Sequence, residues 1–190
     1  MSIFQNAEFI ISCASMSQFP ESQLSEIVMA GRSNVGKSSV INRLTQRKSL
    51  AYVGKKPGKT RLINFYKVPD VMMLVDVPGY GYAQRSMGEL KTYGTLMEDY
   101  FSNRPQLKAV MLVVDCRLGL TQDDWDMFHF IQSKHLPMAI VATKSDKLNY
   151  QKKVLIVKQL KETTMQEVFL VSALKHEGIE ALIEWCRQYI

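Results

Sequence analysis

Short apolar runs alternate along the chain with longer segments in which apolar residues recur every three or four positions. The short runs predict β-strands over residues 8–13, 27–31, 62–68, 71–76, 109–115, 138–142 and 167–171. The longer segments predict helices over residues 37–46, 88–103, 121–134, 151–162 and 178–189. Pro69 and Asp70 separate two of the strands and indicate a tight turn between antiparallel partners.

The order of these elements predicts the fold class. Most of the strands are apolar almost throughout, which is typical of strands covered on both faces. Because helices separate them, we expect a three-layer α/β fold with a mostly parallel sheet. One strand of the hairpin should run antiparallel, and residues 8–13 should add an extra N-terminal edge strand. No repeat or linker interrupts the pattern, so we predict a single domain over residues 1–190.

Composition narrows the class of protein. The 190 residues are 46% hydrophobic and 22% charged, near the average for globular domains. No apolar stretch reaches the ~20 residues of a membrane span, and neither a secretory signal nor a lipidation motif is evident. Cys13, Cys116 and Cys186 lack metal-ligand spacing and suit reduced thiols. We therefore expect a cytoplasmic protein without membrane attachment, and a monomer.

Positive charge is concentrated in one segment. The chain has 24 basic and 18 acidic residues, a formal net charge of +6. Ten basic residues and no acidic one lie between Ile27 and Pro69: Arg32, Lys37, Arg43, Arg47, Lys48, Lys55, Lys56, Lys59, Arg61 and Lys67. Removing these ten from the 24 leaves 14 basic residues against 18 acidic ones. Charge alone favours equally a solvated basic face and a surface that binds RNA or a ribosome.

An octapeptide in this segment matches G-x-x-x-x-G-K-[ST], the loop that wraps the phosphates of a nucleoside triphosphate: Gly31, Arg32, Ser33, Asn34, Val35, Gly36, Lys37 and Ser38. The glycines let several N–H groups point at one anion, and the following helix adds its positive dipole end. Lys37 can reach the β- and γ-phosphates, and the Ser38 hydroxyl can ligate Mg²⁺. A glycine-rich turn with an incidental lysine is the alternative, but the predicted strand before it and helix after it favour the phosphate loop.

A second tetrapeptide, Asp76-Val77-Pro78-Gly79, follows the strand at 71–76. Asp76 can hold Mg²⁺, usually through water, and the Gly79 N–H can meet a γ-phosphate oxygen. Such tetrapeptides are common turns, so the signal depends on its position after the phosphate loop and a hairpin. In the basic loop before that hairpin, Thr60 is the candidate for a switch threonine that closes on Mg²⁺ and the γ-phosphate.

A third tetrapeptide, Thr143-Lys144-Ser145-Asp146, lies at the end of a later strand, where ligands bind in parallel sheets. Guanine presents two donors to a carboxylate, whereas adenine presents an acceptor, so Asp146 should select guanine. Lys144 can lay its aliphatic stem along the base. The backbone of Val171, Ser172 and Ala173 is placed to contact guanine O6.

These elements resemble the Ras-like P-loop GTPases, and finer details look like the bacterial EngB/YihA/YsxC family. The details are Gly31 to Ser39, Lys56-Pro57-Gly58-Lys59-Thr60, Asn64-Phe65-Tyr66, Asp76-Val77-Pro78-Gly79-Tyr80-Gly81-Tyr82-Ala83 and Thr143 to Asp146. The resemblance covers essentially the whole chain. It implies a GTP- and GDP-binding switch that uses Mg²⁺, hydrolyses GTP, acts on the large ribosomal subunit or its rRNA, and supports cell division and septation.

The resemblance also assigns the residues of the site. The phosphate loop would extend to Ser39. The basic loop would lie within the first switch, where the nucleotide-contacting residues would be Gly58, Lys59, Thr60, Arg61 and Leu62. The metal would be held by Ser38, Thr60 and Asp76, and the second switch would be Asp76, Val77, Pro78 and Gly79. The base site would comprise Thr143, Lys144, Ser145, Asp146, Val171, Ser172 and Ala173. Lys37, Thr60 and Gly79 would act directly in catalysis.

Three positions carry further expectations. Tyr80 stands where Ras-like proteins have a water-orienting glutamine, so unassisted hydrolysis should be slow. Thr143 replaces the usual asparagine, which leaves one base-to-loop hydrogen bond open and indicates modest affinity. In related GTPases, an asparagine at the position of Asn34 accompanies a K⁺ ion beside the phosphates, so K⁺ is an expected second cation.

Two other classes of protein share parts of this pattern. A small kinase would use the same phosphate loop but needs an acceptor pocket and usually an arginine-rich lid, whereas Arg85, Arg104 and Arg117 are scattered. Asp146 has no clear role in such an enzyme. A membrane-trafficking GTPase is disfavoured by the missing lipid anchor and by the Pro-Gly-Tyr sequence of the second switch.

Overall fold

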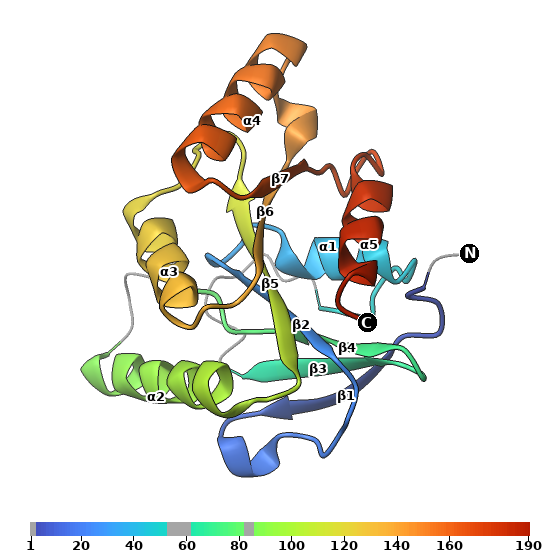
Figure 1. Cartoon of the computed structure of the whole chain (residues 1–190), viewed down its shortest axis with the longest axis vertical. Coiled ribbons are helices and arrows are strands. Elements are labelled where there is room, and N and C mark those ends of the chain that lie inside the picture. The colour runs from blue at the N-terminus through green and yellow to red at the C-terminus, as the bar shows by residue number, and fades with distance from the viewer. Residues whose placement is uncertain (1–2, 53–61, 82–85) are drawn as a thin grey trace.

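A seven-stranded β-sheet forms the centre of the computed structural model, which describes residues 3–52, 62–81 and 86–190 (Figure 1). The strands are β1 (Glu8–Cys13), β2 (Glu26–Gly31), β3 (Ile63–Val68), β4 (Met72–Asp76), β5 (Leu107–Asp115), β6 (Met138–Thr143) and β7 (Glu167–Leu170). They lie in the order β1-β3-β4-β2-β5-β6-β7. Only β3 runs against its neighbours, pairing antiparallel with β1 and β4. The predicted fold class, with one antiparallel strand and an N-terminal edge strand, is confirmed.

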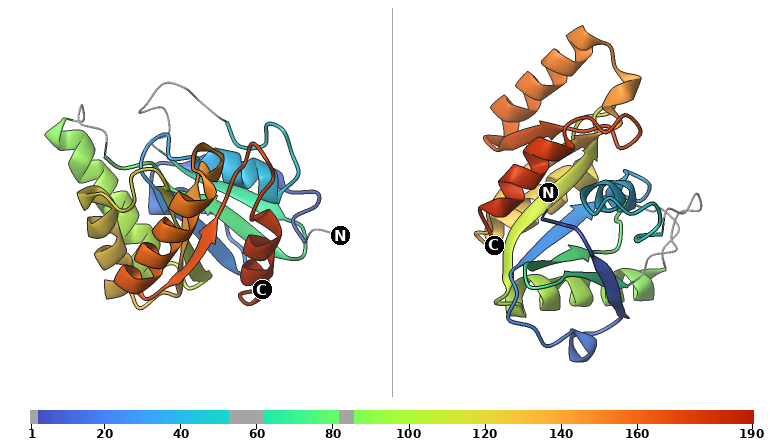
Figure 2. Two further views of the ribbon diagram at one scale, coloured as in Figure 1. Left: turned by 90° about the horizontal axis from the view of Figure 1, so that it is seen from above. Right: turned by 90° about the vertical axis from the view of Figure 1, so that its right-hand side faces the viewer.

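Helices cover both faces of this sheet (Figures 1 and 2). They are α1 (Lys37–Leu44), α2 (Met87–Asn103), α3 (Gln122–Ser133), α4 (Tyr150–Thr164) and α5 (Ile179–Arg187), with 3₁₀ turns η1 (Met16–Gln18) and η2 (Ser145–Lys147). Successive side chains of a strand point to opposite faces. Accordingly, Ile27 and Met29 of β2 join the core under α1 and α5, whereas Val28 and Ala30 join the core under α2 and α3.

The predicted element boundaries agree with the structure to within about two residues, and local chemistry explains the differences. The first helix ends at Leu44 rather than at Gln46 because Gln46 takes a left-handed backbone, with φ of +56°. The Thr45 hydroxyl also bonds back to the Ile41 carbonyl at 2.8 Å. Helix α4 continues to Thr164, and the left-handed Met165 ends it.

A buried acidic residue fixes the start of the central strand. Glu26 is fully buried and accepts hydrogen bonds from the Tyr100 hydroxyl at 2.9 Å and from Arg104 at 2.6 Å. Both partners belong to the C-terminal end of α2. The same Arg104 guanidinium lies over the ring of Phe65, 5.6 Å from its centroid. Tyr100 and Arg104 therefore hold the start of β2 against α2, at the end of the strand opposite the phosphate loop.

None of the helices in the described ranges is long and apolar enough to cross a membrane. Cys13, Cys116 and Cys186 are buried and form no disulfide with one another.

Candidate nucleotide-binding site

The carboxyl ends of four strands bring the predicted motifs to one edge of the sheet. The parallel register places Met29 of β2 beside Asp76 of β4, and Gly31 beside Val113 of β5. It also places Asp115 at the end of β5 beside Thr143 at the end of β6. The phosphate loop, the Asp76 tetrapeptide and the Thr143 tetrapeptide therefore converge, as expected for ligand sites in open parallel sheets.

The phosphate loop leaves β2 at Gly31 and enters α1 at Lys37. Gly36 has φ of +117°, a conformation that favours glycine, and Asn34 is left-handed with φ of +60°. The Lys37 ammonium donates to the Gly31 carbonyl at 3.0 Å and lies 3.4 Å from the Arg32 carbonyl. The lysine thus folds back over the loop, above the N-terminus of α1, where an anion is favoured.

Asp76 is a buried carboxylate at this edge of the sheet. It is 3% exposed, and its Oδ1 has no hydrogen-bond partner among the described residues. Burial raises its pKa from 3.8 to about 6, although the nearby Lys37 ammonium opposes this rise. A buried oxygen without a protein partner fits a site in which water or Mg²⁺ completes the contacts. Within the described ranges, no three His, Cys, Asp or Glu residues gather, so hydroxyl and phosphate oxygens would have to supply the remaining ligands.

Thr143 links its own tetrapeptide, residues 143–146, to the phosphate loop. Its buried hydroxyl lies 2.7 Å from the Val35 carbonyl and 3.0 Å from the Val114 carbonyl. A threonine hydroxyl has one proton, so it donates to one of these acceptors at a time. The Thr143 side chain is shorter than that of the usual asparagine, but it still reaches the phosphate loop at Val35.

The Lys144 side chain is held by one group at the end of β5 and by another in the phosphate loop. Its ammonium donates to Asp115 Oδ2 at 2.9 Å and to the Asn34 carbonyl at 3.0 Å. Arg117 also binds Asp115, with Nε and Nη2 at 2.9 and 2.6 Å from its two oxygens. Burial alone would raise the pKa of Asp115, but the hydrogen bonds from Arg117 and Lys144 lower it well below the ordinary value. Asp115 is thus an ionised anchor for Lys144.

The Asp146 carboxylate is oriented by the end of β7. The Ser172 hydroxyl donates to Asp146 Oδ1 at 2.7 Å, and Lys147 lies 3.5 Å from Oδ2. The bond from Ser172 lowers the pKa of Asp146, so the group is ionised at neutral pH and can only accept hydrogen bonds. Ser145 connects the same two loops through its N–H, which donates to the Val171 carbonyl at 3.2 Å.

The segment after Asp76 packs directly on the phosphate loop. A Cβ on Gly79 would lie 2.8 Å from the backbone nitrogen of Ser33, so only glycine fits this approach. Ser33 donates its N–H to the Tyr80 carbonyl at 3.1 Å. The Tyr80 side chain is 8% exposed, and its hydroxyl donates to Asp124 at 2.8 Å. In this arrangement, the hydroxyl of Tyr80 faces α3.

The structure does not describe all of the remaining predicted residues. Gly58, Lys59, Thr60 and Arg61 fall outside the described residues, so their assignment stays a prediction. Leu62 is half-buried and lines a separate cavity of about 490 Å³ with residues of α2. Ser38 and Ser39 are half-buried in the first turn of α1.

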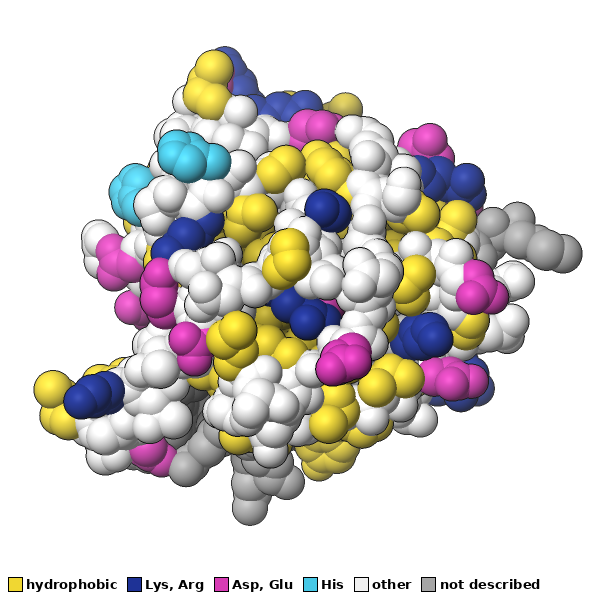
Figure 3. Space-filling view, turned by 60° about the horizontal axis from the view of Figure 1, so that its bottom comes forward, with side chains coloured by type: hydrophobic (Ala, Val, Ile, Leu, Met, Phe, Trp, Pro, Cys, Tyr) yellow, Lys and Arg dark blue, Asp and Glu magenta, His cyan; other side chains and the backbone are white. Residues whose placement is uncertain are grey.

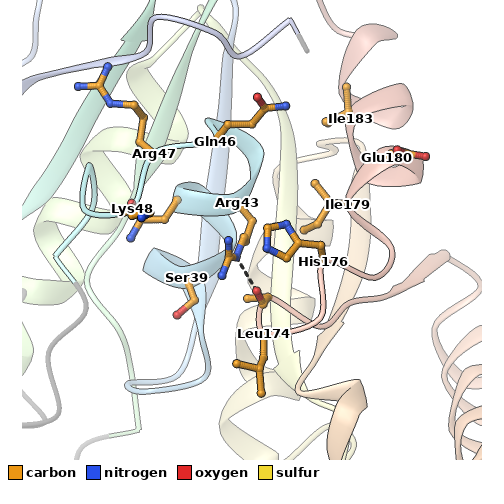
Figure 4. Close-up of a pocket in the computed structure, with 12 residues that line it drawn as sticks. Ser39, Arg43, Gln46, Arg47, Lys48, Leu174, His176, Ile179, Glu180 and Ile183 are labelled. Carbon is orange, nitrogen blue, oxygen red and sulfur yellow. Dashed lines mark hydrogen bonds between the residues drawn. The ribbon is translucent and has the colours of Figure 1, made fainter. Parts of the chain in front are cut away.

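A cavity of about 680 Å³ adjoins this site between α1 and the start of α5 (Figure 4). Arg43 points into it and donates to the Ala173 carbonyl. Arg47 and Lys48 lie beyond the end of α1 and line the same cavity. Three residues of the basic segment thus adjoin the Ala173 loop. By contrast, the face in Figure 3 has acidic and basic side chains interspersed, with no large patch of one sign.

Two residues of this region escaped the sequence analysis, namely Asp115 and Asp124. Asp115 ends an apolar strand just as Asp76 does, so the criterion applied to Asp76 could have found it. Asp124 lies three residues after Thr121 in a capping box at the start of α3. That signal predicts a helix end, but not the contact with Tyr80.

Comparisons with known proteins agree with this geometry. Residues 26–144 match the family model described as a 50S ribosome-binding GTPase. A probable GTP-binding protein EngB from Oceanobacillus iheyensis is 49% identical over 168 residues, 87% of this chain and 86% of that protein. The EngB of Oenococcus oeni is 41% identical over 96% of this chain and 94% of its own length. The crystal structure of a probable GTP-binding protein engB has a TM-score of 0.68 and 25% identity, covering 87% of this chain and 98% of that one.

Proposed function

The chain belongs to the EngB family of GTP-binding proteins and is a GTPase. On this basis, we propose that it is a molecular switch that acts in assembly of the large ribosomal subunit. We propose further that it is a cytoplasmic, monomeric single G domain, needed for normal cell division and septation. The observation that carries the proposal is the convergence of Lys37, Asp76 and Asp146 at one edge of the sheet.

Asp146 would select the base. As an ionised carboxylate held by Ser172, it accepts the N1–H and the exocyclic amine of guanine together. Adenine would place an unprotonated nitrogen against the same charge, and a desolvated anion without a donor is costly. Lys144, fixed by Asp115, would lie along the base plane. The backbone of Val171, Ser172 and Ala173 would contact guanine O6.

The phosphate loop and α1 would bind the triphosphate. Residues 31–39 would supply N–H donors, and the Lys37 ammonium would exchange its contact with the Gly31 carbonyl for phosphate oxygens. Ser38, Asp76 and Thr60 would hold Mg²⁺, which neutralises charge that develops on the phosphates. Residues 58–62 would contact the nucleotide from the first switch. Gly79 would offer its N–H to the γ-phosphate, and closure of both switches would signal the GTP state.

Hydrolysis would be slow without a partner. A glutamine can orient water through its amide, whereas the Tyr80 hydroxyl is engaged with Asp124. The resemblance to GTPases with an asparagine at this loop position supports a role for K⁺ beside Asn34, whose side chain is exposed in the phosphate loop. Hydrolysis should then be faster in KCl than in NaCl at matched ionic strength with the ribosomal partner present. Equal rates of hydrolysis in KCl and NaCl would contradict a role for K⁺.

The basic segment supports the ribosomal partner. One cavity beside the loop that contains Ala173 is lined by Arg43, Arg47 and Lys48. The family model that matches the chain is described as a 50S ribosome-binding GTPase. Lys55, Lys56 and Lys59 belong to the basic loop, which would lie within the first switch. The charge offered to rRNA would thus depend on the nucleotide state.

Membership of the EngB family disfavours the P-loop phosphotransferase weighed from the sequence, and product analysis tests the difference directly. Purified protein with GTP should release free phosphate without phosphorylating an added acceptor. Sedimentation with purified large ribosomal subunits should then be stronger with a non-hydrolysable GTP analogue than with GDP. A phosphorylated acceptor would support the kinase, and equal sedimentation in both states would contradict the ribosomal switch.

A further inference from the structure

Asp124, in the first turn of α3, is contacted by two other parts of the chain and by the N-cap of its own helix. Its carboxylate is fully buried, and Oδ1 accepts the Tyr80 hydroxyl at 2.8 Å. Oδ2 accepts the N–H and the hydroxyl of Thr121 at 3.0 and 2.8 Å. Arg32 of the phosphate loop places Nε 3.5 Å from the same oxygen, as an ion pair. One carboxylate therefore connects the phosphate loop, the segment after Gly79 and the start of α3.

A backbone link accompanies these side-chain contacts. Arg32 and Tyr80 form an isolated parallel bridge, in which Ser33 donates its N–H to the Tyr80 carbonyl at 3.1 Å. Gly79 abuts Ser33 so closely that an added Cβ would lie 2.8 to 2.9 Å from three of its atoms. These contacts fix the backbone of residues 79 and 80 against Ser33, so a second switch that moves Gly79 toward a γ-phosphate would have to break them.

We propose that Asp124 is a positioning residue of the GTPase cycle, which holds Tyr80 and Arg32 in an arrangement that must open before the second switch closes on a γ-phosphate. The inference rests on the proposed role of residues 76–79 as that switch. GDP, which lacks the γ-phosphate, is compatible with the closed link. The link therefore lowers the affinity for GTP relative to GDP.

Tyr80→Phe tests this with the least disturbance. It keeps the packed ring and the Thr121 cap of α3 but removes the hydroxyl that donates to Asp124. The chain offers a matched control in Tyr100→Phe, because the Tyr100 hydroxyl is also buried and donates to a buried carboxylate, Glu26, at 2.9 Å. Both variants lose one hydrogen bond to a charged group, but only one of them lies beside the phosphate loop.

The measurement is the ratio of dissociation constants for GDP and for the GTP analogue GMPPNP, each with Mg²⁺. Tyr80→Phe should shift this ratio toward GMPPNP by about tenfold, the scale of one hydrogen bond to a charge, while Tyr100→Phe leaves it unchanged. Asp124→Asn, which keeps one acceptor oxygen for either Tyr80 or Thr121 and removes the charge opposite Arg32, should shift it in the same direction.

An unchanged ratio in both Tyr80→Phe and Asp124→Asn would overturn the inference, as would an equal shift in Tyr100→Phe. A purely structural role would lower the melting temperature of Tyr80→Phe and Tyr100→Phe alike and leave both ratios alone. If the unmodified protein failed to bind either guanine nucleotide, the proposed function would fail instead.

Discussion

Asp115 lies 2.9 Å from the ammonium of Lys144, although one residue ends β5 and the other follows β6. The parallel register brings the two strand ends together by pairing Asp115 with Thr143. Lys144 also reaches the Asn34 carbonyl, so the lysine expected along the base is tied to a neighbouring strand and to the phosphate loop.

Replacing Asp115 by Asn should weaken this anchor. We expect the affinities for GDP and for GMPPNP to fall together by about tenfold, the scale of one lost charge-assisted hydrogen bond. Titration calorimetry measures both, and Asp126→Asn on the exposed face of α3 is the control. A loss confined to one nucleotide would place Asp115 in the phosphate switch rather than beside the base.

Replacing Asp76 by Asn should stabilise the nucleotide-free protein. The folded-state pKa of about 6 exceeds the ordinary 3.8, so the folded protein retains a proton that the unfolded chain releases as the pH rises through this window. The charged form is therefore unfavourable above pH 6, by about 2 to 3 kcal/mol at 1.36 kcal/mol per pKa unit. Urea unfolding in EDTA at pH 7.5 should show this gain, and at pH 5 the gain should shrink.

The exposed turn residue Asp70 offers the control, because Asp70→Asn should change the free energy of unfolding little at either pH. Asp76→Asn should at the same time impair Mg²⁺-dependent GTP hydrolysis. A loss of stability at pH 7.5 would show that the Asp76 carboxylate has a favourable partner in the folded protein.

Replacing Arg104 by Ala should destabilise the fold without touching the site. Among the described side chains, it leaves the fully buried Glu26 carboxylate with the Tyr100 hydroxyl as its remaining partner. Breaking a buried ion pair in this way costs about 3 to 5 kcal/mol. Thermal and urea unfolding measure the loss, with the exposed Lys108→Ala as the control. Because Glu26 starts β2 and the phosphate loop follows its end, the GDP affinity of the folded variant should stay unchanged.

Replacing Lys55, Lys56 and Lys59 together by Ala should weaken binding to large ribosomal subunits and leave GDP affinity nearly unchanged. Each lost phosphate contact should reduce the slope of log affinity against log salt by about 0.7 to 0.9. The matched control removes the same charge from exposed positions of α4, as Lys152, Lys158 and Lys161 to Ala. An unaltered salt slope, or an equal effect of the α4 variant, would contradict a docking role for the basic loop.

Sequence patterns were sufficient for the fold, because apolar runs and helical periodicity persist along each element. They also located Lys37, Asp76 and Asp146, since each belongs to a motif whose neighbours are close in sequence. They could not reveal the contacts of Asp115 or Asp124, because these depend on which strand ends and helix ends become neighbours in three dimensions. The reach of the Thr143 hydroxyl to Val35 likewise depends on the backbone path of the loop.

Base selectivity tests the central claim most directly. We expect titration with GDP and ADP to show preference for GDP by about a hundredfold or more, because a site built to accept two donors penalises an acceptor strongly. In Asp146→Asn, GDP should lose this advantage, and xanthosine diphosphate, which presents a carbonyl in place of the exocyclic amine, should bind more tightly than GDP. Equal affinity of the unmodified protein for GDP and ADP would contradict the account.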